Sequence, residues 1–216
     1  MDKICVSIFA NDFDFCLEVV KKYDFVELRL DEGKLSHSQV SEIITTGKNI
    51  IATCRKGYIS DEKQFESLLS AINHGCDYID IEHDLVTAYK NKLIDTSKAN
   101  ECKIISSYHN LKITPNFNEL KRNALKLNGN CDIIKIACKV NTRDDLMNLI
   151  KLYDELPSGR LISIGLGELG KISRIAALFL GAPFTYASYS GKAKTADGQI
   201  DYLDMKRILD VLEYDI

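Results

Sequence analysis

Two side chains that together can act on a ketone lie in neighbouring β-like segments of the sequence. Lys135 lies within the apolar run DIIKIAC, and lysine is the residue whose pKa moves most readily on burial. A neutral amine attacks a ketone to give a protonated imine, which withdraws electrons from an adjacent carbanion. His109 lies in the preceding segment KIISSYH, and an imidazole suits removal of the proton beside such an imine. The pair predicts imine chemistry with proton transfer.

Further charged side chains alternate with apolar ones along other β-like segments. Glu27, Arg29 and Asp31 share one face of a strand, and Asp80 shares a face with Glu82 two segments later. An unpaired charge in an apolar interior costs several kcal/mol. We therefore expect these groups to face one another in a polar cavity. A buried layer of ion pairs is the alternative for Glu27 and Arg29.

The elements that position these residues repeat along the whole sequence. Eight β-branched segments begin near residues 3, 25, 50, 78, 103, 132, 161 and 184, and apolar residues at helical spacing lie between them, as in 65–72, 146–153 and 205–212. Strict alternation requires a parallel sheet, and eight units of about 26 residues fit a (β/α)₈ TIM barrel, whose chemistry lies at the carboxyl ends of the strands. A doubly wound open sheet is the alternative. We expect one domain over residues 1–216.

Charge and cysteine content exclude several classes of function. The 216 residues include 28 basic and 31 acidic side chains with no long run of one sign, so binding to nucleic acid or an anionic membrane lacks electrostatic support. No apolar stretch reaches the ~18 residues that a membrane span needs, and the first residues do not resemble a secretory signal. A cytoplasmic protein is therefore expected. The seven cysteines are odd in number, scattered and mostly embedded in apolar runs, which indicates reduced, buried thiols.

The other histidines do not predict a metal site. His83 has the wrong strand parity for a cavity and is expected under a helix. His37 and His74 lie in polar segments that are expected at the surface. Their spacing matches no metal-ligand motif.

Two later segments have the composition of active-site loops. GLGELG, at residues 165–170, has the letters of a dinucleotide motif, but too little chain follows it for that fold. A barrel loop is expected instead, with Arg174 placed to bind an anion. A solvated helix position is the alternative for Arg174. The small polar run at 190–199 predicts a mobile lid with Thr195 and Gln199 as hydrogen-bond donors, or else a solvated connector.

Together these motifs resemble the type I 3-dehydroquinate dehydratases, imine-forming barrel enzymes of the shikimate pathway. The resemblance runs nearly end to end and rests on ELRLD, TCR, SYHN, DIIKIA, GxxGxxSR and TADGQ, in the family's order. It implies dehydration of 3-dehydroquinate to 3-dehydroshikimate and water. It also implies that no metal or organic cofactor is needed and that the protein is a homodimer.

The resemblance assigns a role to each matching residue. Lys135 is implied to form the imine, and His109 to remove the neighbouring proton and then protonate the departing hydroxyl. The implied substrate ligands are Arg174, Thr195 and Gln199 for the carboxylate, and Ser7, Glu27, Arg29 and Arg55 for the ring hydroxyls.

Two positions depart from the family's pattern. The family has a glutamate four residues after the arginine of the third strand, where it partners the catalytic histidine, and this chain has Ile59 there. We hypothesise that Glu82 partly replaces that glutamate. Asp197 stands where the family often has proline, and it adds a negative charge near the expected carboxylate site.

Two other functions stay open at the level of sequence. The first is an imine-forming aldolase on the same barrel, which would hold a sugar phosphate with the GLGELG loop, although Glu168 would oppose a dianion. The second is a catalytically silent barrel that binds a small carboxylate or another protein. The missing loop glutamate supports the second.

Overall fold

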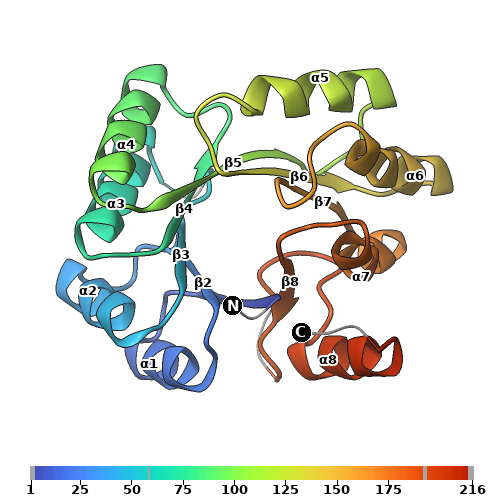
Figure 1. The fold of residues 1–216 in the computed structure, drawn as a ribbon. Coiled ribbons are helices and arrows are strands. Elements are labelled where there is room, and N and C mark those ends of the chain that lie inside the picture. The colour runs from blue at the N-terminus through green and yellow to red at the C-terminus, as the bar shows by residue number, and fades with distance from the viewer. Residues whose placement is uncertain (1–2, 58, 192–193, 214–216) are drawn as a thin grey trace. The chain divides into compact units, whose positions relative to one another are not determined.

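The computed structural model describes residues 3–57, 59–191 and 194–213, in which strands and helices alternate as predicted (Figure 1). Contacts group the chain into two compact units. Unit 1 is Val6–Ile105, and unit 2 is Ser106–Ile216 together with residues 3–5. That residues 1–216 form a single domain stays a prediction.

Unit 1 consists of parallel strands with its helices on one face (Figure 1). Its elements are β1 (Ile4–Phe9, which begins in unit 2), α1 (Phe13–Lys22), β2 (Val26–Arg29), α2 (His37–Thr46), β3 (Ile50–Thr53), α3 (Asp61–Asn73), β4 (Tyr78–Glu82) and α4 (Thr87–Ala99). The strands pair in chain order from β1 to β4. The charged ends of β2, β3 and β4 therefore lie on adjacent strands.

Polar caps and apolar stripes explain where the helices of unit 1 form. The side chains of Asp12, Ser36 and Ser60 each accept a backbone N–H in the first turn of α1, α2 and α3. The stripe predicted at 65–72 lies in α3, where Leu68 and Ile72 are buried. The buried sides of these helices pack against the strands. The loops that follow the strands are therefore available for the predicted active site.

Unit 2 repeats the same alternation. Its elements are β5 (Lys103–Asn110, which begins in unit 1), α5 (Phe117–Leu127), β6 (Ile133–Lys139), α6 (Arg143–Lys151), η1 (Leu152–Asp154), β7 (Leu161–Leu166), η2 (Glu168–Gly170), α7 (Lys171–Phe179), β8 (Thr185–Ser188) and α8 (Tyr202–Val211). Strands β6 and β7 are parallel, with Lys135 opposite Ile162.

The apolar face of β6 fixes the direction of Lys135. Ile134, Ile136 and Cys138 pack in one cluster with Leu120 of α5 and Leu149 of α6. Because side chains alternate along a strand, the side chain of Lys135 lies on the opposite face of β6. Lys135 therefore does not point into the apolar cluster between β6 and its helices.

A second cluster fixes β8 in the same way. Ala187 of β8 packs with Leu178 of α7 and with Met205 and Leu209 of α8. Met205 and Leu209 of the stripe predicted at 205–212 form the buried side of α8, whereas Leu212 lies beyond the helix and is half exposed. Tyr186, one residue before Ala187, lies on the other face of the strand.

The expectation that His83 lies under a helix is wrong, and the expected burial of the cysteines is confirmed for all but Cys131. His83 is exposed rather than covered by a helix, because β4 ends at Glu82 and strand alternation stops there.

The seven cysteines are free thiols, and Cys131 alone among them is only partly buried. Burial raises the pKa of the Cys54 thiol to about 12, which keeps it protonated and unreactive.

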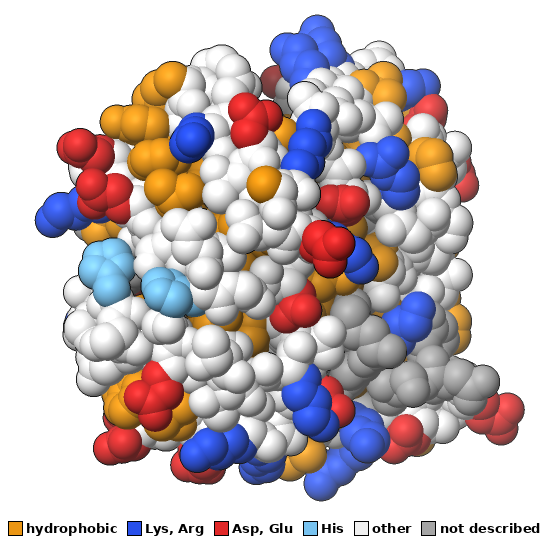
Figure 2. Space-filling model, turned by 60° about the vertical axis from the view of Figure 1, so that its left-hand side comes forward, with side chains coloured by type: hydrophobic (Ala, Val, Ile, Leu, Met, Phe, Trp, Pro, Cys, Tyr) orange, Lys and Arg blue, Asp and Glu red, His pale blue; other side chains and the backbone are white. Residues whose placement is uncertain are grey.

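The surface shows the mixture of charges that the composition predicts. Acidic and basic side chains are interspersed on the face seen in Figure 2. Within the described residues, no helix is both long enough and apolar enough to cross a bilayer.

Candidate active site

Glu27 on β2 is held by hydroxyl groups from both neighbouring strands. Ser7 lies opposite Glu27 in the β1–β2 register, and its hydroxyl donates to one carboxylate oxygen. Thr53 of β3 donates to the other oxygen at 3.0 Å. All three side chains are buried. The result is a fixed acceptor on the face of β2 that the sequence predicted to be polar.

Arg29 forms a buried two-pronged ion pair with Asp31. The guanidinium Nε lies 2.8 Å from one carboxylate oxygen and Nη2 lies 2.9 Å from the other. The guanidinium carbon also lies 5.2 Å from the centre of the Phe9 ring. These contacts fix the planar group on both its edge and its face.

Arg55 follows β3 and lies among three carboxylates. It donates to Asp80 at 2.6 and 3.0 Å and to Glu82 at 3.4 Å, and its Nη2 lies 4.0 Å from Glu27. Burial opposes the charge on Arg55, but these carboxylates outweigh burial and raise the pKa of the guanidinium above its ordinary value. Arg55 is therefore always charged.

The predicted charged residues of unit 1 thus form ion pairs and hydrogen bonds with one another. This agrees with the alternative of a buried ion-pair layer for Glu27 and Arg29. The carboxylates of Glu27, Asp31, Asp80 and Glu82 outnumber the two guanidinium groups they contact. Glu82 also accepts the backbone N–H of Lys56 at 2.9 Å, so its predicted partnership with His109 stays a prediction.

Lys135 is the predicted nucleophile, and it is only 4% exposed. Its Nζ lies over the Tyr186 ring of β8, 3.9 Å from the ring centre. Tyr186 is not among the residues predicted from the sequence. Strand parity could have found it, because Tyr186 alternates with Ala187, which packs against α8.

The predicted base lies on the strand next to that of Lys135. His109 is the seventh residue of β5, and β5 neighbours β6 in the sheet. Its side chain is half-buried. Imidazole and amine therefore come from adjacent strands of unit 2, as the sequence predicts.

Arg174 is buried in α7, so the solvated alternative for this residue is wrong. It is 1% exposed, and its Nε donates to the backbone carbonyl of Gly198 at 3.1 Å. The neighbouring Ser173 is structural, because its hydroxyl accepts the N–H of Gly165 at 2.7 Å and donates to the carbonyl of Gly170 at 2.6 Å. These bonds fasten the loop after β7 to the start of α7.

Thr195 and Gln199 bond to each other across the loop before α8. The Gln199 carbonyl accepts the Thr195 N–H at 2.9 Å, and the Gln199 amide donates to the Thr195 hydroxyl at 2.9 Å. Both side chains are buried. The lid predicted at 190–199 includes residues 192 and 193, which lie outside the described residues.

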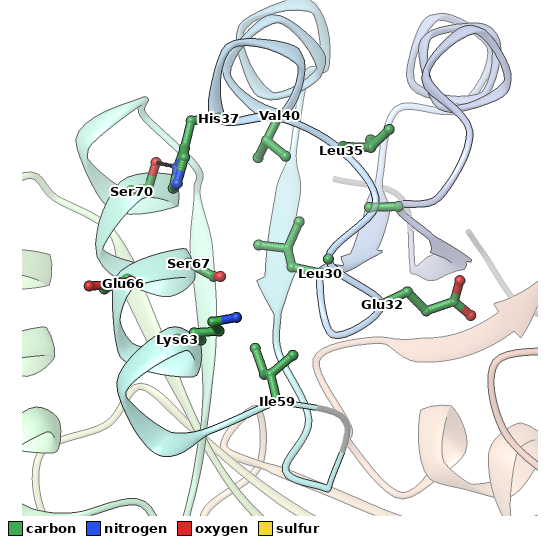
Figure 3. A pocket seen from close by; sticks show the side chains of 12 residues that line it. Leu30, Glu32, Leu35, His37, Val40, Ile59, Lys63, Glu66, Ser67 and Ser70 are labelled. Atoms are coloured by element: carbon green, nitrogen blue, oxygen red, sulfur yellow. Dashed lines mark hydrogen bonds between the residues drawn. The ribbon is translucent and has the colours of Figure 1, made fainter.

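A separate pocket of about 370 Å³ lies in unit 1, between α2 and α3 (Figure 3). No residue of the predicted site lines it. Ile59, which stands where the resemblance places a glutamate, points into this pocket beside Leu30 and Lys63 (Figure 3). His37 and Ser70 are hydrogen-bonded at 3.3 Å on its wall. No continuous sequence pattern marks this pocket, because its lining comes from three loops and two helices.

Comparison with known proteins defines the class of the chain. A crystal structure of type I 3-dehydroquinate dehydratase from Clostridium difficile matches 97% of the chain and 91% of its own length with a TM-score of 0.82 at 23% identity. The 3-dehydroquinate dehydratase of Aquifex aeolicus matches with a TM-score of 0.79 at 29% identity, over 97% of this chain and 98% of that one. The chain is thus a (β/α)₈ protein of the dehydroquinase type, as predicted.

The family follows from sequence similarity. The type I 3-dehydroquinase family matches residues 4–215, and the chain belongs to that family. A protein named 3-dehydroquinate dehydratase from Methanococcus vannielii is 35% identical, over 97% of this chain and all of that protein.

Proposed function

We propose that the chain converts 3-dehydroquinate to 3-dehydroshikimate and water through an imine on Lys135. It acts as a hydro-lyase of the shikimate pathway, which leads to the aromatic amino acids. The observation that carries the proposal is the burial of Lys135 on β6 in a chain that matches the type I family from residue 4 to residue 215. The name of the relative from Methanococcus vannielii supports the same reaction.

The chemistry divides between an amine and an imidazole. The Lys135 amine adds to the ketone carbon, and the adduct loses one water to give a protonated imine. His109 removes a proton from the adjacent carbon, and the bonding electrons flow into the imine to form an enamine. The enamine returns its electrons and expels the β-hydroxyl, which His109 protonates to water. A second water then hydrolyses the imine, which releases the product and restores the lysine.

We assign the polar side chains to the two ends of the substrate. Arg174 binds the carboxylate, assisted by Thr195 and Gln199, because a guanidinium donates two parallel hydrogen bonds to such a group. The ring hydroxyls are bound by Ser7, Glu27, Arg29 and Arg55. The buried Glu27 carboxylate, already fixed by Thr53, supports an acceptor role.

A direct assay tests this function. Purified protein with 3-dehydroquinate should develop the ultraviolet absorbance of a conjugated enone. A protein that cleaves a phosphorylated ketose instead, with competition by inorganic phosphate, would be an aldolase. Binding of a small carboxylate without absorbance change would indicate the silent barrel. Either result would contradict the proposed reaction.

We expect Glu82→Gln to lower turnover about tenfold and to shift the pH profile. The proposed cause is loss of a carboxylate that partly replaces the partner of His109, and a wholly essential orienting carboxylate would cost about 10⁴-fold. Glutamine keeps an acceptor for the N–H of Lys56, which Glu82 binds at 2.9 Å, so the fold should survive. Turnover and pH profile are measured together by the enone assay. An unchanged profile with full turnover would rule out this role.

We also propose that the chain works as a homodimer, as is common in its family. Leu169, Ile172 and Phe179 are each about half exposed, and Ile172 and Phe179 lie seven residues apart on one face of α7. An apolar helix face of this kind supports an interface between copies. Light scattering during gel filtration should give twice the mass of one chain.

We propose a cytoplasmic location for the chain. The seven free thiols support it, because thiols persist in reducing compartments. Cell fractionation with an antibody against the chain should find it with cytoplasmic enzymes.

A further inference from the structure

Three segments of unit 2 meet at the ion pair between Lys139 and Asp197. Lys139 is the last residue of β6, and its Nζ lies 2.5 Å from the Asp197 carboxylate in the loop before α8. The backbone carbonyl of Asp197 also accepts the N–H of Gly167, in the loop after β7, at 3.3 Å. One short loop is thereby tied to two neighbouring strand ends.

Two glycines allow these segments to approach so closely. Gly167 has φ of +86°, and the Lys139 Nζ occupies the space that a Cβ of residue 167 would need. Gly198 has φ of +73°, and its α-carbon faces the backbone of Gly167. A side chain at either position would be strained by the positive φ, and a side chain at position 198 would also collide with the backbone of Gly167. The position of the 195–199 loop therefore depends on close backbone packing as well as on the ion pair.

The same loop supplies a hydrogen-bond acceptor to Arg174. The carbonyl of Gly198, the residue after Asp197, accepts the Nε of Arg174 at 3.1 Å. Gln199, which follows, is fastened to Thr195 by the hydrogen bonds described above. A shift of Asp197 would move the Gly198 carbonyl and, with it, the guanidinium plane.

We propose that Lys139 and Asp197 are positioning residues whose ion pair holds the 195–199 loop so that the Gly198 carbonyl orients Arg174 toward the substrate carboxylate. The inference rests on the proposed function, since it takes Arg174 as the carboxylate ligand. The hydrogen bond from Lys139 lowers the pKa of Asp197, which keeps the Asp197 carboxyl group ionised at neutral pH.

The negative charge of Asp197 could affect substrate binding in two opposite ways. Asp197 by itself repels an anionic substrate. If this repulsion were its only effect, neutralising Asp197 would improve substrate binding. If the ion pair positions Arg174, neutralisation weakens binding instead. The two explanations predict opposite signs for the change in KM.

A double-mutant cycle in the enone assay tests the inference. Asp197→Asn and Lys139→Met should each raise KM about threefold with kcat nearly unchanged, the size expected for a partly exposed ion pair. The double variant should be no worse than either single variant, because both remove the same interaction. In about 0.5 M NaCl the difference between wild type and variants should shrink, because salt screens the pair.

Glu168→Gln is the matched control. Glu168 pairs with Lys171 at 2.6 Å, and its side chain is 78% exposed against 61% for Asp197. It carries the same charge in the adjacent loop, so its variant should keep the wild-type KM. A KM for Asp197→Asn at or below wild type, or additive effects in the double variant, would overturn the inference. Failure of the proposed function appears separately, as wild-type protein that forms no enone.

Discussion

Replacing Lys135 with alanine should abolish both turnover and covalent trapping of the substrate. Borohydride reduces an imine to a stable amine, so wild-type protein treated with 3-dehydroquinate and borohydride should carry a permanent adduct. Loss of a covalent nucleophile costs on the order of 10⁵- to 10⁶-fold in rate, which places the variant near background. Lys135→Met is the second variant, because its unbranched side chain fills the buried site beside Tyr186 without an amine.

The position of the adduct can be read from the trypsin fragments. A modified Lys135 resists trypsin, so residues 127–139 should appear as one fragment carrying the added mass. Modification of Lys139 would instead leave residues 136–143 joined. Circular dichroism confirms that each variant is folded. Normal turnover by either Lys135 variant, or an adduct confined to Lys139, would defeat the mechanism.

Much of the scaffold could be predicted because burial leaves a periodic signal in the sequence. Ile134, Ile136 and Cys138 alternate with Lys135, and their packing against α5 and α6 is what strand parity predicts. The alternation fails where a strand stops. His83 follows the last residue of β4, so its exposure could not be read from parity.

Contacts between loops could not be predicted in the same way. Lys139 and Asp197 are 58 residues apart, and a partly exposed ion pair imposes no period on the sequence. From the sequence alone Asp197 is an uncompensated charge beside the expected carboxylate site, whereas in the structure it pairs with Lys139. The sequence leaves Arg174 open between burial and solvent, because its partner, the Gly198 carbonyl, is a backbone group that side-chain patterns do not reveal.

Replacing His109 with alanine should separate imine formation from proton transfer. The Lys135 amine is retained, so borohydride should still trap an adduct on residues 127–139. Turnover should fall about 10²- to 10⁴-fold, the usual contribution of general acid–base catalysis. The enone assay and mass spectrometry on the same sample measure the two steps.

His83→Ala is the control for this variant. His83 is exposed and follows β4, so its loss removes an imidazole without touching the proposed chemistry and should leave turnover unchanged. If His109→Ala fails to form the adduct while remaining folded, His109 acts before or during imine formation rather than after it. If His109→Ala turns over at the wild-type rate, another group is the base. The acid–base assignment stands only if trapping survives and turnover does not.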